Sequence, residues 1–219
     1  MNQKPTVVLL HGLARTARSM ARLERLITEA GYPTWSWTYP SRRQGIEALA
    51  DAVAERLADD LGDTPVIGVT HSLGGIIVRH LAERANWQGV VMLAPPNGGS
   101  ELARRLSGQS LFRWFFGPAG QDVGSPETWP SAPRPVAVIA GTGGASIKNP
   151  PSLLASALSL LPTTEAHDGT VSVNETRLPN MAGFATVDAT HTWIMNHPEA
   201  LALVLRFLDT GSFRELDPA

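Results

Sequence analysis

Cysteine is absent from this chain of 219 residues. Disulfides, thiolate metal sites and a cysteine nucleophile are therefore excluded, although the absence leaves the redox environment open. An excess of one charge is also lacking, because 18 basic residues face 20 acidic ones and the formal net charge is −2. Nucleic-acid binding requires clustered basic charge, so we expect no nucleic acid as a partner.

Long apolar runs are lacking as well. No segment approaches the roughly 20 apolar residues that span a bilayer, so we expect no transmembrane segment. The short run VVLL, which begins at Val7, leads directly into His11 without the small-residue cleavage site of a signal peptide. We therefore expect a cytoplasmic protein. The chain length suits a single α/β domain that covers residues 1–219.

Short β-branched, apolar runs alternate with helical patterns along most of the chain. Apolar residues recur at three- and four-residue spacing between the runs, for example from Met20 to Ile27 and from Ile46 to Leu57. This alternation predicts a mostly parallel, doubly wound sheet of about six strands, with helices on both faces. The predicted strands are Val7–Leu10, Thr34–Trp37, Val66–Val69, Val90–Leu93, Val136–Ala140 and Phe184–Ala189.

Two segments depart from this alternation. Residues 97–135 are rich in Gly, Pro and Ser but contain the apolar cluster SLFRWFF, and residues 143–165 contain SLLASALSLLP. We interpret both segments as excursions from the sheet, of the kind that form lids or binding loops.

A polar residue stands at the corner between the strand pattern VIGVTH and the helical pattern LGGIIVRH. This residue is Ser72, and Gly74 and Gly75 follow it closely. Ligands of a doubly wound sheet bind beyond the carboxyl ends of its strands, which is where Ser72 falls. Two interpretations remain open at this point: Ser72 is an ordinary helix N-cap, or it is a nucleophile presented at the positive end of a helix.

The segment THSLG resembles the nucleophile elbow of the α/β-hydrolases, whose pattern is Gly-x-Ser-x-Gly, with Thr70 in place of the first glycine. The family's chain order is serine, then acid, then histidine. Asp168, in the Asp-Gly turn of AHDGTV, resembles the family's acid. His191, in THTWIM after the last predicted strand, resembles its base. The resemblance thus implies a catalytic triad of Ser72, Asp168 and His191 in an α/β-hydrolase fold.

The pair His11-Gly12 follows the first predicted strand and resembles the start of the family's oxyanion loop. The resemblance implies that the backbone N–H groups of Leu13 and Leu73 form the oxyanion hole.

Other residues compete for these roles. His197 is the main rival base, but it is better placed to cap the closing helix at Pro198. Asp188 is the main rival acid, although its position three residues before His191 turns it to the opposite face of a regular strand. Asp122 comes too early in the chain.

The glycines of residues 141–144 invite a dinucleotide-binding interpretation, but Pro150 follows too soon for the helix that such a site requires. No cluster of His, Asp and Glu has the spacing of metal ligands, so we expect neither a metal nor a cofactor.

The resemblance implies a serine hydrolase that cleaves carboxylic esters, similar to the small lipase-like esterases. The alternatives are an acyltransferase or thioesterase on the same fold, or a non-enzymatic binding module with an inactive triad. The expected partner is a small-molecule ester with an apolar acyl chain. The apolar cluster either lines an acyl pocket or packs its excursion onto the core. The candidate substrate-binding residues are Phe112, Trp114, Phe115 and Leu158.

Overall fold

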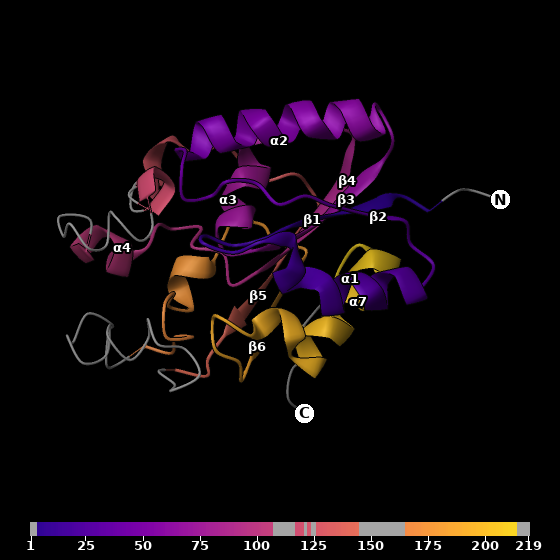
Figure 1. Ribbon diagram of the computed structural model, residues 1–219. Coiled ribbons are helices and arrows are strands. Elements are labelled where there is room, and N and C mark those ends of the chain that lie inside the picture. Colours follow the sequence, from indigo (N-terminus) through magenta and orange to yellow (C-terminus); the bar gives the residue numbers. More distant parts are fainter. Residues whose placement is uncertain (1–3, 107–116, 121, 124–125, 145–164, 214–219) are drawn as a thin grey trace.

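The centre of the protein is a sheet of six strands in the order β2-β1-β3-β4-β5-β6, in which every neighbouring pair is parallel (Figure 1). The structure is a computed structural model that describes residues 4–106, 117–120, 122–123, 126–144 and 165–213. The expectation of a mostly parallel sheet of about six strands is confirmed. The strands are β1 (Thr6–Leu10), β2 (Thr34–Ser36), β3 (Val66–His71), β4 (Trp87–Leu93), β5 (Val136–Gly141) and β6 (Gly183–Val187).

Three of the central strands are buried along their whole length. Every residue of β1, β3 and β5 is buried, whereas buried and half-buried residues alternate in the edge strand β6. Helices cover both faces of the sheet, so a central strand has no face toward water and its sequence is continuously apolar.

Two layers of helices enclose the sheet. Helices α2 (Ile46–Leu61) and α3 (Leu73–His80) lie on one face, and α1 (Ala21–Glu29) and α7 (Pro198–Thr210) lie on the other (Figure 1). The apolar stripes of the first pair pack into one core cluster and those of the second pair into another.

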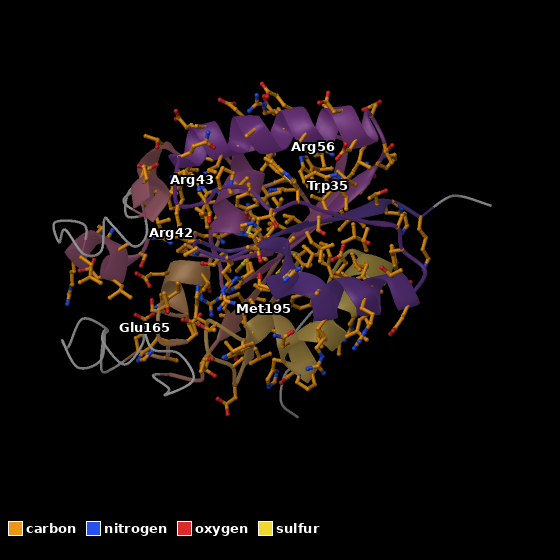
Figure 2. All side chains as sticks on the ribbon, in the orientation of Figure 1. Trp35, Arg42, Arg43, Arg56, Glu165 and Met195 are labelled. Atoms are coloured by element: carbon orange, nitrogen blue, oxygen red, sulfur yellow. The ribbon has the colours of Figure 1, made fainter. Side chains whose placement is uncertain are left out.

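Two side chains mark the two core layers (Figure 2). Trp35 of β2 belongs to the cluster under α2, and its Nε1–H donates to the Asp60 carboxylate of that helix at 2.9 Å. Met195 belongs to the cluster under α1 and α7.

The closing helix α7 begins where the sequence predicts. It begins at Pro198, with His197 as the residue before its first turn, and ends at Thr210, which is followed by Gly211 with a φ of 71°. Proline suits the first helical position because it needs no hydrogen-bond acceptor there, and glycine adopts the left-handed conformation at a helix end.

The strand order reverses beside β1. The chain runs outward from β1 to β2, returns to form β3 on the other side of β1, and then continues through β4, β5 and β6. The loops that follow β1 and β3 therefore diverge at one edge of the sheet and leave a crevice, which is where sheets of this type bind ligands.

Both excursions leave the sheet at its carboxyl end. Helix α4 (Glu101–Leu106) lies at the end of the molecule far from the N-terminus (Figure 1). Among the described residues, no helix is long and apolar enough to cross a bilayer.

Candidate active site

Ser72 occupies a strained corner between β3 and α3. Its φ is 51° and its ψ is −118°, which is a conformation that few residues other than glycine adopt. Ser72 occupies the N-cap position of α3, but its side chain makes no capping hydrogen bond there, so it is not an ordinary serine N-cap. The hydroxyl instead contacts His191, so the strained backbone of Ser72 is retained without a side-chain hydrogen bond to the helix end.

Two glycines make this corner sterically accessible. A Cβ on Gly74 would overlap the carbonyl group of Leu10 in β1, and a Cβ on Gly75 would lie 2.9 Å from Pro95. Helix α3 can therefore begin against β1 only because Gly74 lacks a side chain, and it can approach Pro95, which follows β4, only because Gly75 lacks one. Thr70, which departs from the family pattern, is completely buried in β3 and contributes to the packing below the corner.

Ser72, His191 and Asp168 form one line of hydrogen-bonded side chains. The Oγ of Ser72 lies 2.9 Å from Nε2 of His191, and Nδ1 of His191 lies 2.7 Å from an oxygen of Asp168. A carboxylate accepts, so Nδ1–H of His191 donates to Asp168 and Nε2 is left to accept the Ser72 proton. This arrangement is the geometry that a serine nucleophile with a general base requires.

The turn that carries Asp168 fixes its carboxylate. The Asp168 side chain is 1% exposed, and its second oxygen accepts the N–H groups of Thr170 and Val171 at 2.9 and 2.8 Å. The His191 N–H also donates to the Asp168 carbonyl at 2.9 Å. The two backbone N–H groups and Nδ1–H of His191 together hold the buried carboxylate in one orientation.

The rival residues lie elsewhere. Asp188 is exposed, and Asp122 accepts the N–H of Ile46 at the start of α2. His197 precedes α7, and His167 accepts the N–H of Gly169 within its own turn. None of these four side chains makes a hydrogen bond to Ser72 among the described contacts.

His11 orients the loop that follows β1. Its ring is fully buried and stacks on Tyr39, with ring centroids 3.8 Å apart and planes 11° from parallel. The Tyr39 N–H donates to Nε2 of His11, so Nδ1–H of His11 donates to the Gly12 carbonyl at 2.9 Å. Burial lowers the His11 pKa to about 4, partly offset by the Gly12 hydrogen bond, so the ring is neutral at pH 7.

This contact bears on the predicted oxyanion hole. The Gly12 carbonyl and the Leu13 N–H belong to one peptide plane, so the His11 hydrogen bond also sets the direction of the Leu13 N–H. Leu73 is the first residue of α3, where N–H groups have no acceptor within the helix. The next residue of the loop is fixed too, because the Ala14 N–H donates to the Ser41 hydroxyl at 3.0 Å.

The sequence patterns did not reveal Tyr39 and Ser41 as supports of this loop. Both follow β2, and they lie 28 and 27 residues from their partners. A local pattern carries no signal for such a contact.

The buried guanidinium of Arg79 contacts both ends of the first excursion, residues 97–135. Arg79 of α3 donates to the carbonyls of Asn97, Trp129 and Pro130 at 3.1, 3.2 and 2.6 Å. Asn97 opens the excursion, and the other two residues lie near its end. These hydrogen bonds connect both ends of the excursion to α3, the helix that follows Ser72. The predicted substrate-binding residues Phe112, Trp114, Phe115 and Leu158 lie outside the described residues.

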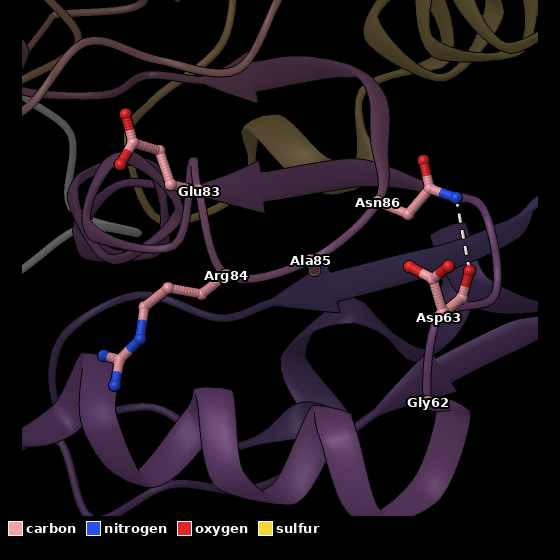
Figure 3. A pocket seen from close by; sticks show the side chains of 6 residues that line it. All are labelled: Gly62, Asp63, Glu83, Arg84, Ala85 and Asn86. Atoms are coloured by element: carbon pink, nitrogen blue, oxygen red, sulfur yellow. Dashed lines mark hydrogen bonds between the residues drawn. The ribbon is translucent and has the colours of Figure 1, made fainter.

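One surface hollow, of about 560 Å³, is lined by residues that precede β3 and β4 (Figure 3). It borders the amino ends of β3 and β4, where a parallel sheet does not place its ligands. Its walls are mostly polar, and Asn86 donates to the Asp63 carbonyl across it. The lining residues are Gly62, Asp63, Glu83, Arg84, Ala85 and Asn86.

Another hollow, of about 440 Å³, adjoins the segment that carries His191. Trp193, which is 49% exposed, forms part of its wall together with Asp188 and His197. No group of three or more His, Asp and Glu side chains in the described part of the chain could hold a metal ion.

Comparison with solved structures gives the same architecture. The mature form of a Bacillus licheniformis lipase matches with a TM-score of 0.72 and 19% identity, over 95% of this chain and 93% of that one. A Paleococcus ferrophilus monoacylglycerol lipase matches with a TM-score of 0.58 and 18% identity, over 96% and 97%. The Legionella pneumophila phospholipase PlaB matches with a TM-score of 0.68 and 18% identity, over 96% of this chain and 60% of that one.

At identities of 18–19%, the similarity to these solved structures shows the fold alone. Sequence comparison with curated proteins gives no match. A family model described as the alpha/beta hydrolase family matches residues 7–204, which is most of the chain. The protein therefore belongs to the alpha/beta hydrolase family.

Proposed function

We propose that this protein is a serine hydrolase that cleaves carboxylic esters through an acyl-enzyme intermediate. The observation that carries the proposal is the contact of His191 with both Ser72 and Asp168, at 2.9 and 2.7 Å. His191 can accept the Ser72 proton at Nε2 while its Nδ1–H donates to Asp168, as general-base activation of a serine requires.

In the first half of the reaction, Ser72 Oγ attacks the ester carbonyl while His191 Nε2 takes the hydroxyl proton. The carbonyl oxygen becomes an oxyanion, which accepts from the N–H groups of Leu13 and Leu73. Asp168 stays ionised and stabilises the imidazolium of His191. The tetrahedral intermediate then collapses, the bond to the alcohol oxygen breaks, and His191 returns the proton to the leaving alcohol.

In the second half, His191 takes a proton from water, and the resulting hydroxide equivalent attacks the acyl carbon. Collapse of this second tetrahedral intermediate breaks the acyl bond to Ser72 Oγ, which recovers its proton from His191. The products of this half are a carboxylic acid and the free enzyme, and neither half of the reaction uses a cofactor.

The proposed substrate carries an apolar acyl chain. Phe112, Trp114, Phe115 and Leu158 are predicted to contact this chain, on the basis of the apolar clusters in the two excursions. Replacing Trp114 and Phe115 together by alanine should change the preferred acyl length. The same preference in a folded double variant would count against an acyl-binding role for these two residues.

The proposal is tested by hydrolysis of p-nitrophenyl esters of graded acyl length. Wild type is compared with Ser72→Ala and His191→Ala, each checked for folding by circular dichroism. We expect activity in the wild type and its loss in both variants, by about 10⁴-fold or more. A fluorophosphonate probe should label wild-type Ser72 and leave Ser72→Ala unlabelled.

Two other outcomes would redirect the assignment. Ester turnover that yields mainly a new ester when an alcohol is added would favour an acyltransferase. Absence of both turnover and labelling in the folded wild type would favour a binding module with an inactive triad.

A further inference from the structure

His71 is a buried histidine that the proposed mechanism does not use. It is the last residue of β3, it precedes Ser72 directly, and it is 1% exposed. Its Nε2 lies 2.9 Å from the backbone carbonyl oxygen of His191. A carbonyl only accepts, so Nε2–H of His71 is the donor and Nδ1 carries the lone pair.

This hydrogen bond gives His191 a second contact with the end of β3. Ser72 contacts the His191 ring at Nε2, and the adjacent His71 contacts the His191 carbonyl. The N–H of His191 donates to the Asp168 carbonyl on its other side. The backbone of His191 is therefore held at both its N–H and its C=O, and its ring is held by two further hydrogen bonds.

We propose that His71 is a positioning residue, which holds the backbone of His191 so that the His191 ring stays in register with Ser72. This inference rests on the proposed serine hydrolase function. A base must remain within hydrogen-bond distance of the proton that it removes, and an error of about 1 Å in such an arrangement can lower a rate by about 100-fold.

The surroundings of His71 suit a neutral ring. Burial lowers the His71 pKa well below its ordinary value, and the neighbouring His191 and Arg15 lower it further. Nδ1 has no hydrogen-bond partner among the described residues, and a Cβ on Gly12 would lie only 2.8 Å from it. A proton on Nδ1 would therefore be a buried donor without an acceptor. The neutral ring keeps positive charge away from His191, whose ring centroid is 5.0 Å away.

A purely structural role predicts that any side chain of suitable volume can replace His71. The positioning role predicts that the replacement must donate a hydrogen bond at the place of Nε2. Glutamine and methionine separate these roles because their side chains are similar in length and volume, and only glutamine has an N–H near that place. The matched variants are His71→Gln and His71→Met.

The experiment measures kcat and KM of both variants on the best p-nitrophenyl ester, together with the rate of fluorophosphonate labelling of Ser72. We expect His71→Met to lose roughly 10- to 100-fold in kcat and in labelling rate, with KM little changed, because the loss affects alignment and not ester binding. His71→Gln should recover most of the wild-type kcat. Equal kcat in two folded variants would overturn the proposal.

A measurement on the wild type keeps the proposal testable if a variant fails to fold. Nitrogen NMR of protein labelled with ¹⁵N-histidine distinguishes the two neutral tautomers of a buried ring. We expect His71 to be neutral with its proton on Nε2 at pH 7. A proton on Nδ1 alone would overturn the proposal, because Nε2 of His71 could then not donate to the His191 carbonyl.

The two proposals can fail separately. Absence of ester turnover and of probe labelling in the wild type would refute the serine hydrolase function, whatever the state of His71. Wild-type turnover that depends on Ser72 and His191, with no difference between glutamine and methionine at position 71, would refute only the positioning role.

Discussion

The ring of His11 stacks on the ring of Tyr39 inside the protein. The side chain of each residue also makes a hydrogen bond with the backbone of the other: His11 Nε2 accepts the Tyr39 N–H, and the Tyr39 hydroxyl donates to the His11 carbonyl. The stack leaves the His11 ring without water, and burial lowers its pKa from 6.5 to about 4. The ring thus binds a proton less readily in the folded protein than in the unfolded chain.

This relationship predicts a loss of stability in acid. Between pH 6.5 and about 4 the unfolded chain binds more protons at His11, so the free energy of unfolding falls as the pH falls. The expected contribution of His11 between pH 8 and pH 5 is a loss of about 2 kcal/mol. Urea unfolding at several pH values measures this slope.

The matched variant for this prediction is His11→Asn, which does not titrate and still has an amide N–H for the Gly12 carbonyl. Its stability should fall less steeply between pH 8 and pH 5 than that of the wild type. Parallel curves for the two proteins would mean that other groups account for the acid sensitivity. His71 and His80, whose pKa values are also lowered by burial, should contribute to the remaining slope.

Gly74 should not tolerate a side chain. Gly74→Ala would place a methyl group against the Leu10 carbonyl, so either α3 or β1 must shift and the Ser72 corner must shift with it. We expect a cost of about 2 kcal/mol or more in unfolding free energy, together with reduced probe labelling of Ser72. Gly98→Ala is the control, since a Cβ there meets atoms only at 3.5 Å and beyond. Equal stability of the two variants would contradict the predicted overlap.

Arg79 should contribute more to stability than a surface arginine. Arg79→Met would leave three backbone carbonyls without their donor, so we expect a loss of about 3 kcal/mol. Arg84→Met is the control. Arg84 pairs with Asp51 at the surface, with side chains 43% and 62% exposed, and such pairs contribute about 1 kcal/mol or less. Chemical denaturation measures the unfolding free energy of both variants. Similar losses in the two would argue against a special stabilising role of the Arg79 hydrogen bonds.

Asp168 and Asp188 should differ sharply in their effect on the proposed reaction. Asp168→Asn keeps the shape of the side chain but favours the wrong tautomer of His191, so kcat should fall by about 10³- to 10⁴-fold. Asp188→Asn makes the same chemical change at an exposed position 20 residues along the chain and should leave kcat near the wild-type value. A large loss in the second variant alone would move the acid to Asp188.

The corner at Ser72 and the positions of the strands along the chain were predictable from the sequence because both depend on local patterns. The six β-branched runs pair as six parallel strands, and the helical spacing from Ile46 to Leu57 corresponds to the buried face of α2. Thr70 did not prevent the turn after β3, since the space that the turn requires comes from Gly74 and Gly75. The resemblance of their local sequences to the α/β-hydrolases, and not periodicity, distinguished Asp168 and His191 from the other acids and histidines.

Only the tertiary structure brings His191 to Ser72, because 119 residues separate them and no local pattern encodes which histidine reaches a given serine. The same is true of the His71 contact with the His191 carbonyl, the Tyr39 stack on His11 and the Arg79 contacts with the ends of the first excursion. A local pattern determines which face of a strand or helix is buried. Contacts between loops depend on how the whole sheet twists and packs, and that packing determined the arrangement of the site.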